Sequence, residues 1–264
     1  GRIGRGARQR RYEALCTLAR RAASGLKELR MERTSASEAF CSALRAGDGR
    51  LQQLTSLHMK LDTPPPSAVS VGGVQQALAE VLAAGQLPML RELHLSTWGV
   101  HSVLPLWRAV GEGACPRLER IDIEGCSSQQ LSELAEAMRA RSEGCEGLRA
   151  MCLTLNAAGR EEKQSACEAL QALLSRLSPR SLEELSLQPV PSDSLPAAIV
   201  PALGSEWTAL KTLQLSVMGL FSSDGLLHAL AQGAMPSLSN LDVSGGSCSD
   251  EAWRALGEAM GPEG

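Results

Sequence analysis

Aromatic residues are scarce in this sequence, which holds two Phe, one Tyr and four Trp among 264 residues. Hydrophobic residues nevertheless make up 44% of the chain, enough to build a sizeable core, which must therefore be aliphatic. No apolar run reaches the roughly 18 residues that a membrane-spanning helix needs. The first residues also lack the apolar centre of a signal peptide. These absences predict a soluble, cytoplasmic protein with no membrane partner.

Clustered cysteines are also missing. The eight cysteines are scattered along the chain and none forms a CxxC pair. Zinc sites and small secreted disulfide scaffolds both need cysteines at short, regular spacings. We therefore predict reduced thiols that are mostly buried.

Motifs that carry catalysis are absent as well. No phosphate-binding loop, metalloprotease helix or paired nucleophile and base is found, and the opening GRIGRG lacks both the GxGxxG spacing and a preceding strand. Of the four histidines, only His58 and His94 are expected on one surface. The sequence therefore predicts a protein that is not an enzyme and needs no cofactor or small-molecule substrate.

What the sequence does contain is an internal repeat. An apolar residue followed by others three and five positions later occurs eight times. The copies begin at Leu26, Leu54, Leu90, Leu118, Leu148, Leu182, Leu210 and Leu238. Four of the seven steps between them are 28 residues and the other three are longer. A fixed unit with insertions in its loops explains this spacing.

Apolar residues with helical spacing lie between successive copies, such as Val74, Leu78, Val81 and Leu82. Several of these stretches begin after a serine that can cap a helix, such as Ser127, and they end at Gly or Pro. A short strand alternating with a helix predicts an α/β fold with a parallel sheet and helices on one face. Because no copy encloses its own core, its apolar residues must be buried against those of neighbouring copies.

The pattern LxxLxLxx(N/C)xxL, clearest in LERIDIEGCSSQQL from Leu118, resembles leucine-rich repeats of the ribonuclease-inhibitor-like class. The resemblance implies a horseshoe-shaped solenoid of about eight repeats, with the sheet on the concave face and the helices on the convex face. The chain departs from the pattern at the Asn/Cys position, where only Cys126 and Asn156 fit. The other occupants are Thr34, Asp62, Trp98, Val190, Met218 and Gly246. We therefore expect irregular turns after the strands, with Trp98 tucked inward.

The two ends of the chain differ from the repeats. Residues 1–21 hold seven arginines and one acid, Glu13, which could bind nucleic acid or an anionic membrane, although a solvated leader is the favoured interpretation. We predict that residues 1–24 are a basic N-terminal segment with a capping helix and that residues 25–264 are the repeat domain. Trp107 and Trp253 are expected in the core. Because nothing after Trp253 covers the strand at Leu238, we interpret the chain as a fragment or one that ends abruptly.

Polar residues between the apolar positions should form rows across the exposed side of the sheet. One predicted row reads Arg30, His58, His94, Asp122, Cys152, Ser186, Gln214 and Asp242. Two histidines, an aspartate and a cysteine are zinc-ligand types. A flat row holds side chains in parallel rather than converging them, so ordinary surface residues are the favoured interpretation and no metal site is predicted.

The predicted face carries mixed charges and no basic stripe with stacking aromatics, so no nucleic-acid partner is expected. Its charged middle is the predicted binding surface for a protein partner of unknown identity. The candidate residues are His58, Arg91, Glu92, His94, Glu119, Arg120, Asp122, Glu124, Arg149 and Glu184.

The resemblance thus implies a non-catalytic protein-protein interaction module that binds its partner through the concave sheet. Two alternatives remain open. The chain could be a regulatory or substrate-recognition segment of a larger sensor or ubiquitin-ligase receptor, which flanking sequence would reveal. It could also be a small-GTPase regulator, by fold analogy alone.

Overall fold

The computed structural model describes most of the chain. It covers residues 25–32, 37, 40–41, 44–45, 51–61, 73–100, 102–140, 147–156, 160–191, 203–204, 206–222 and 224–260. The predicted basic segment and capping helix at residues 1–24 lie outside the described residues, as do Thr34 and Asp62. The chain divides into two compact units, residues 1–124 and 125–264, which are taken in turn.

Strands and helices alternate in both units. The first unit contains β1 (Glu28–Met31), β2 (Ser56–Lys60), α3 (Gly73–Ala83), β3 (Glu92–Ser96), α4 (Leu104–Gly111) and β4 (Arg120–Cys126), the last two residues of which belong to the second unit. The second unit contains α5 (Ser128–Ala140), β5 (Ala150–Leu155), α6 (Arg160–Leu174), β6 (Glu184–Pro191), β7 (Thr212–Ser222), α8 (Asp224–Ala231), β8 (Asn240–Ser247) and α9 (Asp250–Met260). The predicted alternation of strand and helix is confirmed from β2 to β6 and from β7 to α9.

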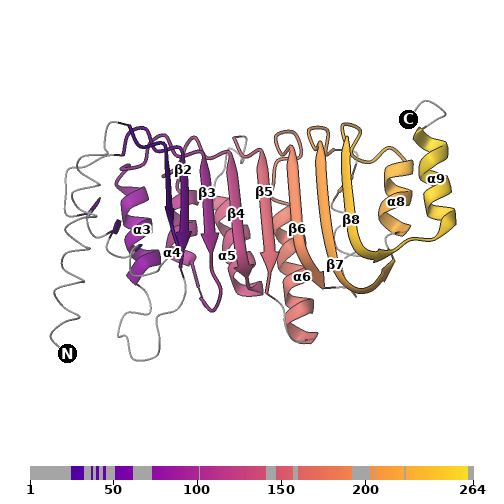
Figure 1. Cartoon of the computed structure of the whole chain (residues 1–264), viewed down its shortest axis with the longest axis horizontal. Coiled ribbons are helices and arrows are strands. Elements are labelled where there is room, and N and C mark those ends of the chain that lie inside the picture. The colour runs from indigo at the N-terminus through magenta and orange to yellow at the C-terminus, as the bar shows by residue number, and fades with distance from the viewer. Residues whose placement is uncertain are drawn as a thin grey trace. The chain divides into compact units, whose positions relative to one another are not determined.

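The eight strands form a parallel sheet whose order follows the chain (Figure 1). Within each unit the register places equivalent repeat positions side by side, as in Leu57, Leu93 and Ile121. Beyond the middle of the strands the register shifts, between Leu187 and Val190 and again between Ser216 and Phe221. These shifts lie where the sequence predicted irregular turns.

The core of each unit lies between its strands and its helices. The apolar strand positions, such as Leu93 and Leu213, are fully buried, and so are the helix positions Leu78 and Leu134. Each fully buried leucine contributes roughly 1.5 to 3 kcal/mol. The aliphatic core expected from the shortage of aromatic residues is therefore present, with Trp107 as a buried exception.

Three helices end in the same way. At the ends of α3, α4 and α8, Gly85, Gly113 and Gly233 adopt φ angles of +63°, +87° and +85°. In each case the glycine N–H donates to the carbonyl three residues earlier, and the next N–H donates to the carbonyl five residues before it. This is the Schellman arrangement, which turns the chain sharply toward the following strand.

The predicted serine caps also open their helices. The Ser127 hydroxyl accepts the Gln130 N–H at 3.3 Å, and the Gln130 side-chain oxygen accepts the Ser127 N–H at 3.1 Å. This reciprocal pair is a capping box at the start of α5. Ser249 likewise accepts the Ala252 N–H at 3.2 Å at the start of α9.

One backbone contact recurs at the entry to the strands. Within each unit, the carbonyl of the residue just after a repeat's first leucine accepts two N–H groups from the following repeat. Thr55 O, for example, accepts the N–H groups of Arg91 and Glu92, and Arg91 O accepts those of Glu119 and Arg120. Arg149, Glu183 and Lys211 play the same part in the second unit. This shared carbonyl fixes where each strand begins relative to its neighbour.

The expectation for Trp253 was wrong. Ala252 is fully buried in α9, but Trp253, one step around the helix, is 52% exposed. The apolar repeat residues Leu238, Leu241 and Val243 are only half-buried, unlike the equivalent residues of β2 and β3, such as Leu57 and Leu93. In the part of the chain that the structure describes, no helix is long and apolar enough to cross a membrane.

Candidate functional site

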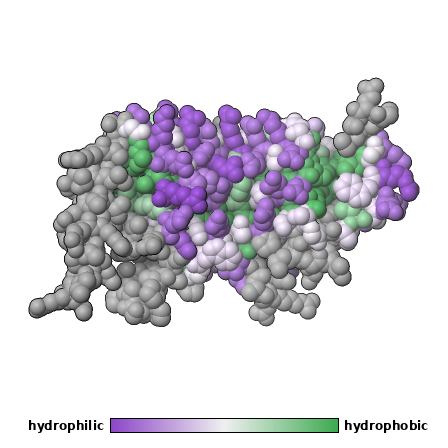
Figure 2. Space-filling model, viewed as in Figure 1, coloured by the Kyte–Doolittle hydropathy of each residue, from purple (hydrophilic) through white to green (hydrophobic). Residues whose placement is uncertain are grey.

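The polar positions of β1 to β4 carry several ionisable residues and form a surface that we call the charged face. Its rows follow the predicted register: Arg30 pairs with His58, His58 with His94, and His94 with Asp122. The neighbouring row runs through Glu28, Ser56, Glu92 and Arg120. In Figure 2 hydrophilic residues cover the region where Figure 1 places β2 to β4.

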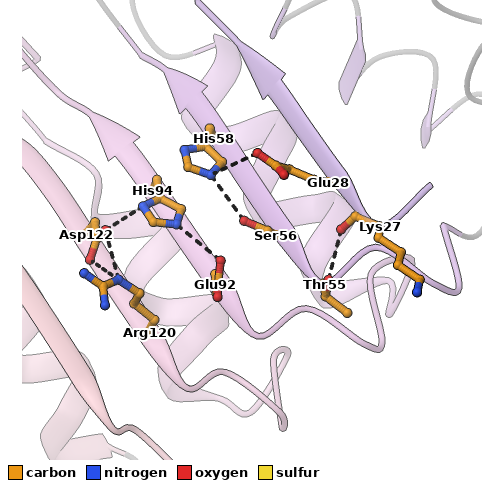
Figure 3. A network of polar contacts seen from close by, with 9 residues as sticks. All are labelled: Lys27, Glu28, Thr55, Ser56, His58, Glu92, His94, Arg120 and Asp122. Carbon is orange, nitrogen blue, oxygen red and sulfur yellow. Dashed lines mark hydrogen bonds and ion pairs between the residues drawn. The ribbon is translucent and has the colours of Figure 1, made fainter. Parts of the chain in front are cut away.

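Two histidines on adjacent strands stack face to face at the centre of the charged face (Figure 3). The ring centroids of His58 and His94 are 3.7 Å apart and the ring planes differ by 5°. Parallel strands separated by about 4.8 Å place equivalent side chains side by side, so the register makes the two histidines neighbours and their rotamers bring the rings into contact. The sequence placed both residues in one row but did not predict that they touch.

His94 is also the start of a polar chain that crosses to β4. Its Nδ1 lies 2.6 Å from Asp122 Oδ2. The Nε group of Arg120 donates to both carboxylate oxygens of Asp122, at 3.0 and 3.1 Å. On the other side of the ring, His94 Nε2 lies 3.6 Å from Glu92 Oε2. One imidazole thus faces two carboxylates, one of which is held by a guanidinium.

These contacts set the charge of the pair. Burial by itself would lower the pKa of His94, but the hydrogen bond and negative charge of Asp122, helped by Glu92, outweigh it and raise that pKa above its usual 6.5. Burial would likewise raise the pKa of Asp122, and the combined effect of His94 and Arg120 lowers it below 3.8. The geometry therefore favours a protonated His94 beside an ionised Asp122.

The surroundings of His58 stabilise its protonated form less than those of His94 do. Its Nε2 lies 3.2 Å from the Ser56 hydroxyl and 3.9 Å from Glu28 Oε1. Its pKa is lowered below 6.5, first by burial and then by the positive charge of His94. Glu28 and Glu92 counter this only in part. The two stacked rings thus differ in their affinity for a proton.

The arrangement does not suit a metal ion. Stacked, nearly parallel rings direct their nitrogen lone pairs side by side rather than toward a common point, and Nδ1 of His94 is already bound to Asp122. Among the described residues, no group of three or more His, Cys, Asp or Glu side chains could hold a metal.

Ion pairs lie at the start of strands in each unit. In the first unit Arg91 pairs with Glu119 at 3.0 Å. In the second unit Glu183 pairs with Lys211 at 2.7 Å and with Arg149 at 3.4 Å. Three of these five residues were predicted as partner-binding, whereas Glu183 and Lys211 were missed. Their signal was the alternating charge at one repeat position.

The remaining predicted residues lie apart from the histidine stack. Glu124 is exposed near the end of β4, and within the described ranges it has no ion-pair partner. Glu184 lies in the second unit, where its carboxylate accepts a weak hydrogen bond from the Cys152 thiol at 3.5 Å. The strands around it carry mainly uncharged polar residues, such as Ser186 and Gln214. The predicted set is therefore not one cluster.

The turn after β3 reverses an expectation. Trp98 was expected to tuck inward, but it is 45% exposed. The buried position is taken by Thr97, whose hydroxyl and N–H both donate to the Glu124 carbonyl, at 3.0 and 2.7 Å. Because Thr97 bonds inward, the next side chain is left outside, and an indole lies at the border of the charged face.

No protein-family model and no curated protein sequence matches the chain.

Proposed function

We propose that the chain is a protein-protein interaction module that binds a protein partner through the charged face. The observation that carries the proposal is the connected set of His58, Glu92, His94, Arg120 and Asp122, which strand register and ion pairs hold in place on an open sheet. Groups that are already ordered lose little conformational freedom on binding.

The exposed indole of Trp98 supports the same surface. Protein interfaces draw most of their binding energy from a few Trp, Tyr and Arg side chains surrounded by weaker contacts. The charged face and its border provide one Trp and one Arg of this type, Trp98 and Arg120. We infer that Trp98 is an anchor at the edge of the interface and that the charged residues define its orientation and specificity.

We further propose that the chain is a leucine-rich repeat solenoid of the ribonuclease-inhibitor-like class. The repeated strand, Schellman turn and shared carbonyl support this assignment. None of the six described cysteines forms a disulfide, and burial raises the pKa of Cys41 and Cys126 to about 12. Reduced thiols suit a reducing compartment, and we propose the cytoplasm.

Charge reversal tests the proposed interface. A partner is first identified by crosslinking and affinity capture and then measured by titration calorimetry. We expect Glu92→Lys, Arg120→Glu and Trp98→Ala each to weaken binding by about tenfold or more, since the few residues that dominate an interface each contribute about 1.4 kcal/mol or more.

Matched controls lie on the helices. Arg108 is exposed on α4, and the exposed Glu136 on α5 forms an ion pair with Arg139. Arg108→Glu and Glu136→Lys change the same charges away from the sheet, and we expect binding to be unchanged. Circular dichroism and melting curves establish that every variant is folded. Equal losses on the face and on the helices would contradict the proposal, as would no loss on the face.

A further inference from the structure

The histidine stack at the centre of the charged face tolerates one positive charge better than two. The rings of His58 and His94 are in van der Waals contact, with centroids 3.7 Å apart. Two imidazolium rings at this distance would repel each other strongly, because the charges are partly shielded from water. A stack of one imidazolium and one neutral imidazole avoids the repulsion.

The surroundings decide which ring holds the single charge. His94 has Asp122 at 2.6 Å, and Arg120 holds that carboxylate in place. The nearest carboxylate to a His58 nitrogen, Glu28, is 3.9 Å away and mostly exposed to water. The first proton therefore belongs to His94, and His58 is neutral while the rings remain stacked.

Among the residues that the structure describes, the charged groups around His58 belong to neighbouring positions of the charged face. Strand β1 contributes Glu28 and Arg30, and β2 itself contributes Lys60. Strand β3 contributes Glu92 and His94, and β4 contributes Arg120 and Asp122 behind His94. Burial is the first cause that lowers the His58 pKa, followed by the charge of His94, while Glu28 and Glu92 oppose them. The second proton is therefore taken up below pH 6.5, the usual value.

We propose that the His58–His94 stack is a proton-operated contact: uptake of a second proton from solvent by His58 separates the rings and moves His58 toward Glu28. The change alters both the shape and the charge of the face. In its consequence for partner binding, this inference rests on the function proposed above. Acidification then changes the affinity of the module for its partner.

The ring contact can be tested without a partner. In the whole chain labelled with ¹³C at histidine Cε1, NMR titration follows each ring, and single His→Gln variants assign the four signals. We expect the ring-current displacement of the His94 signal to disappear as His58 titrates. A displacement that persists below the titration midpoints of both rings would overturn the proposal.

Asp122→Asn separates electrostatic coupling from burial, because it keeps the shape and removes the charge that holds the proton on His94. We expect the His94 midpoint to fall and the His58 midpoint to rise. Glu28→Gln should instead lower the His58 midpoint, since it removes the acceptor for the charged ring. An unchanged His58 midpoint in Asp122→Asn would show that the rings are not coupled and would overturn the proposal.

Partner binding tests the regulatory part separately. Between about pH 7.5 and pH 5.5, the range in which histidines titrate, we expect the affinity of the wild-type chain to change at least about fivefold. His58→Gln should lose most of this change. The same pH dependence in both proteins would overturn the regulatory part, whereas the NMR result stands independently. Binding that does not involve the charged face would remove the proposed function and leave the ring contact unaffected.

Discussion

At the scale of single residues, the contact between His94 and Asp122 links stability to pH. The pKa of His94 is raised above 6.5, so its stabilising effect is complete below 6.5 and is lost as the pH rises through the raised pKa. The pKa of Asp122 is lowered below 3.8, so its effect is present above 3.8 and is lost as the pH falls through the lowered pKa. The pair is therefore most stabilising from about pH 4 to 6.5.

Asp122→Asn should reveal this window. We expect the variant to lose about 1 to 3 kcal/mol of unfolding free energy at pH 5, the usual contribution of a hydrogen bond between charged groups. The loss should shrink at about pH 9, where His94 is neutral in both proteins. Urea denaturation across this pH range measures the difference. A loss that does not vary with pH would show that the carboxylate acts through packing or hydrogen bonding alone.

Thr97 offers a second residue-scale prediction. Its buried hydroxyl donates to the Glu124 carbonyl at 3.0 Å and holds the turn that leaves Trp98 outside. Thr97→Val keeps the shape but removes the donor, so we expect a loss of about 1 kcal/mol of stability. Thr97→Ser keeps the hydroxyl and serves as the control. Thermal melting compares the two, and equal melting temperatures would contradict the assigned role.

At the scale of elements, glycine is required where a helix turns back into a strand. Gly113 has a φ of +87°, a conformation that costs other residues roughly 1 to 2 kcal/mol. An added Cβ would meet no atom within 4 Å, so backbone conformation is the only obstacle to substitution. Gly257 also has open space around it but lies within α9 and has no positive φ.

The two glycines should therefore respond with opposite sign. We expect Gly113→Ala to destabilise the protein by about 1 kcal/mol, and Gly257→Ala to stabilise α9 by up to about 1 kcal/mol because alanine is the better helix former. Guanidinium unfolding of both variants gives the comparison. Destabilisation by Gly257→Ala of the same size would show that local space, rather than the φ angle, determines the cost.

At the scale of the whole molecule, one repeat position recurs in different surroundings. Leu93 and Leu213 are fully buried within their units, whereas the equivalent Leu241 in β8 is only half-buried. We expect Leu93→Ala and Leu213→Ala each to cost about 2 to 5 kcal/mol. Leu241→Ala should cost about 1 kcal/mol, since less surface returns to water. Denaturant unfolding measures all three, and equal costs would contradict the difference in packing.

The fold was more predictable from the sequence than the site. The three apolar positions of each copy fix strand direction, burial and register, so the row from His58 to Asp122 followed from spacing alone within the first unit. The stack and the approach of Asp122 to His94 depend on side-chain rotamers, which spacing does not determine. Trp98 was misplaced because a buried polar group one residue earlier took the inward position. Trp253 was misplaced because helical spacing predicts a face but not what covers it.

The carbonyl shared by two N–H groups at the entry to each strand has a consequence for changes in chain length. The next repeat begins 36 residues after the repeat of Thr55 and 28 residues after the repeat of Glu183. In both cases the carbonyl accepts the N–H groups of the two equivalent residues in that next repeat. Residues added or removed between strands are therefore absorbed before the chain reaches this point. We therefore expect that a segment lengthened or shortened between two strands leaves the register of the following strand unchanged.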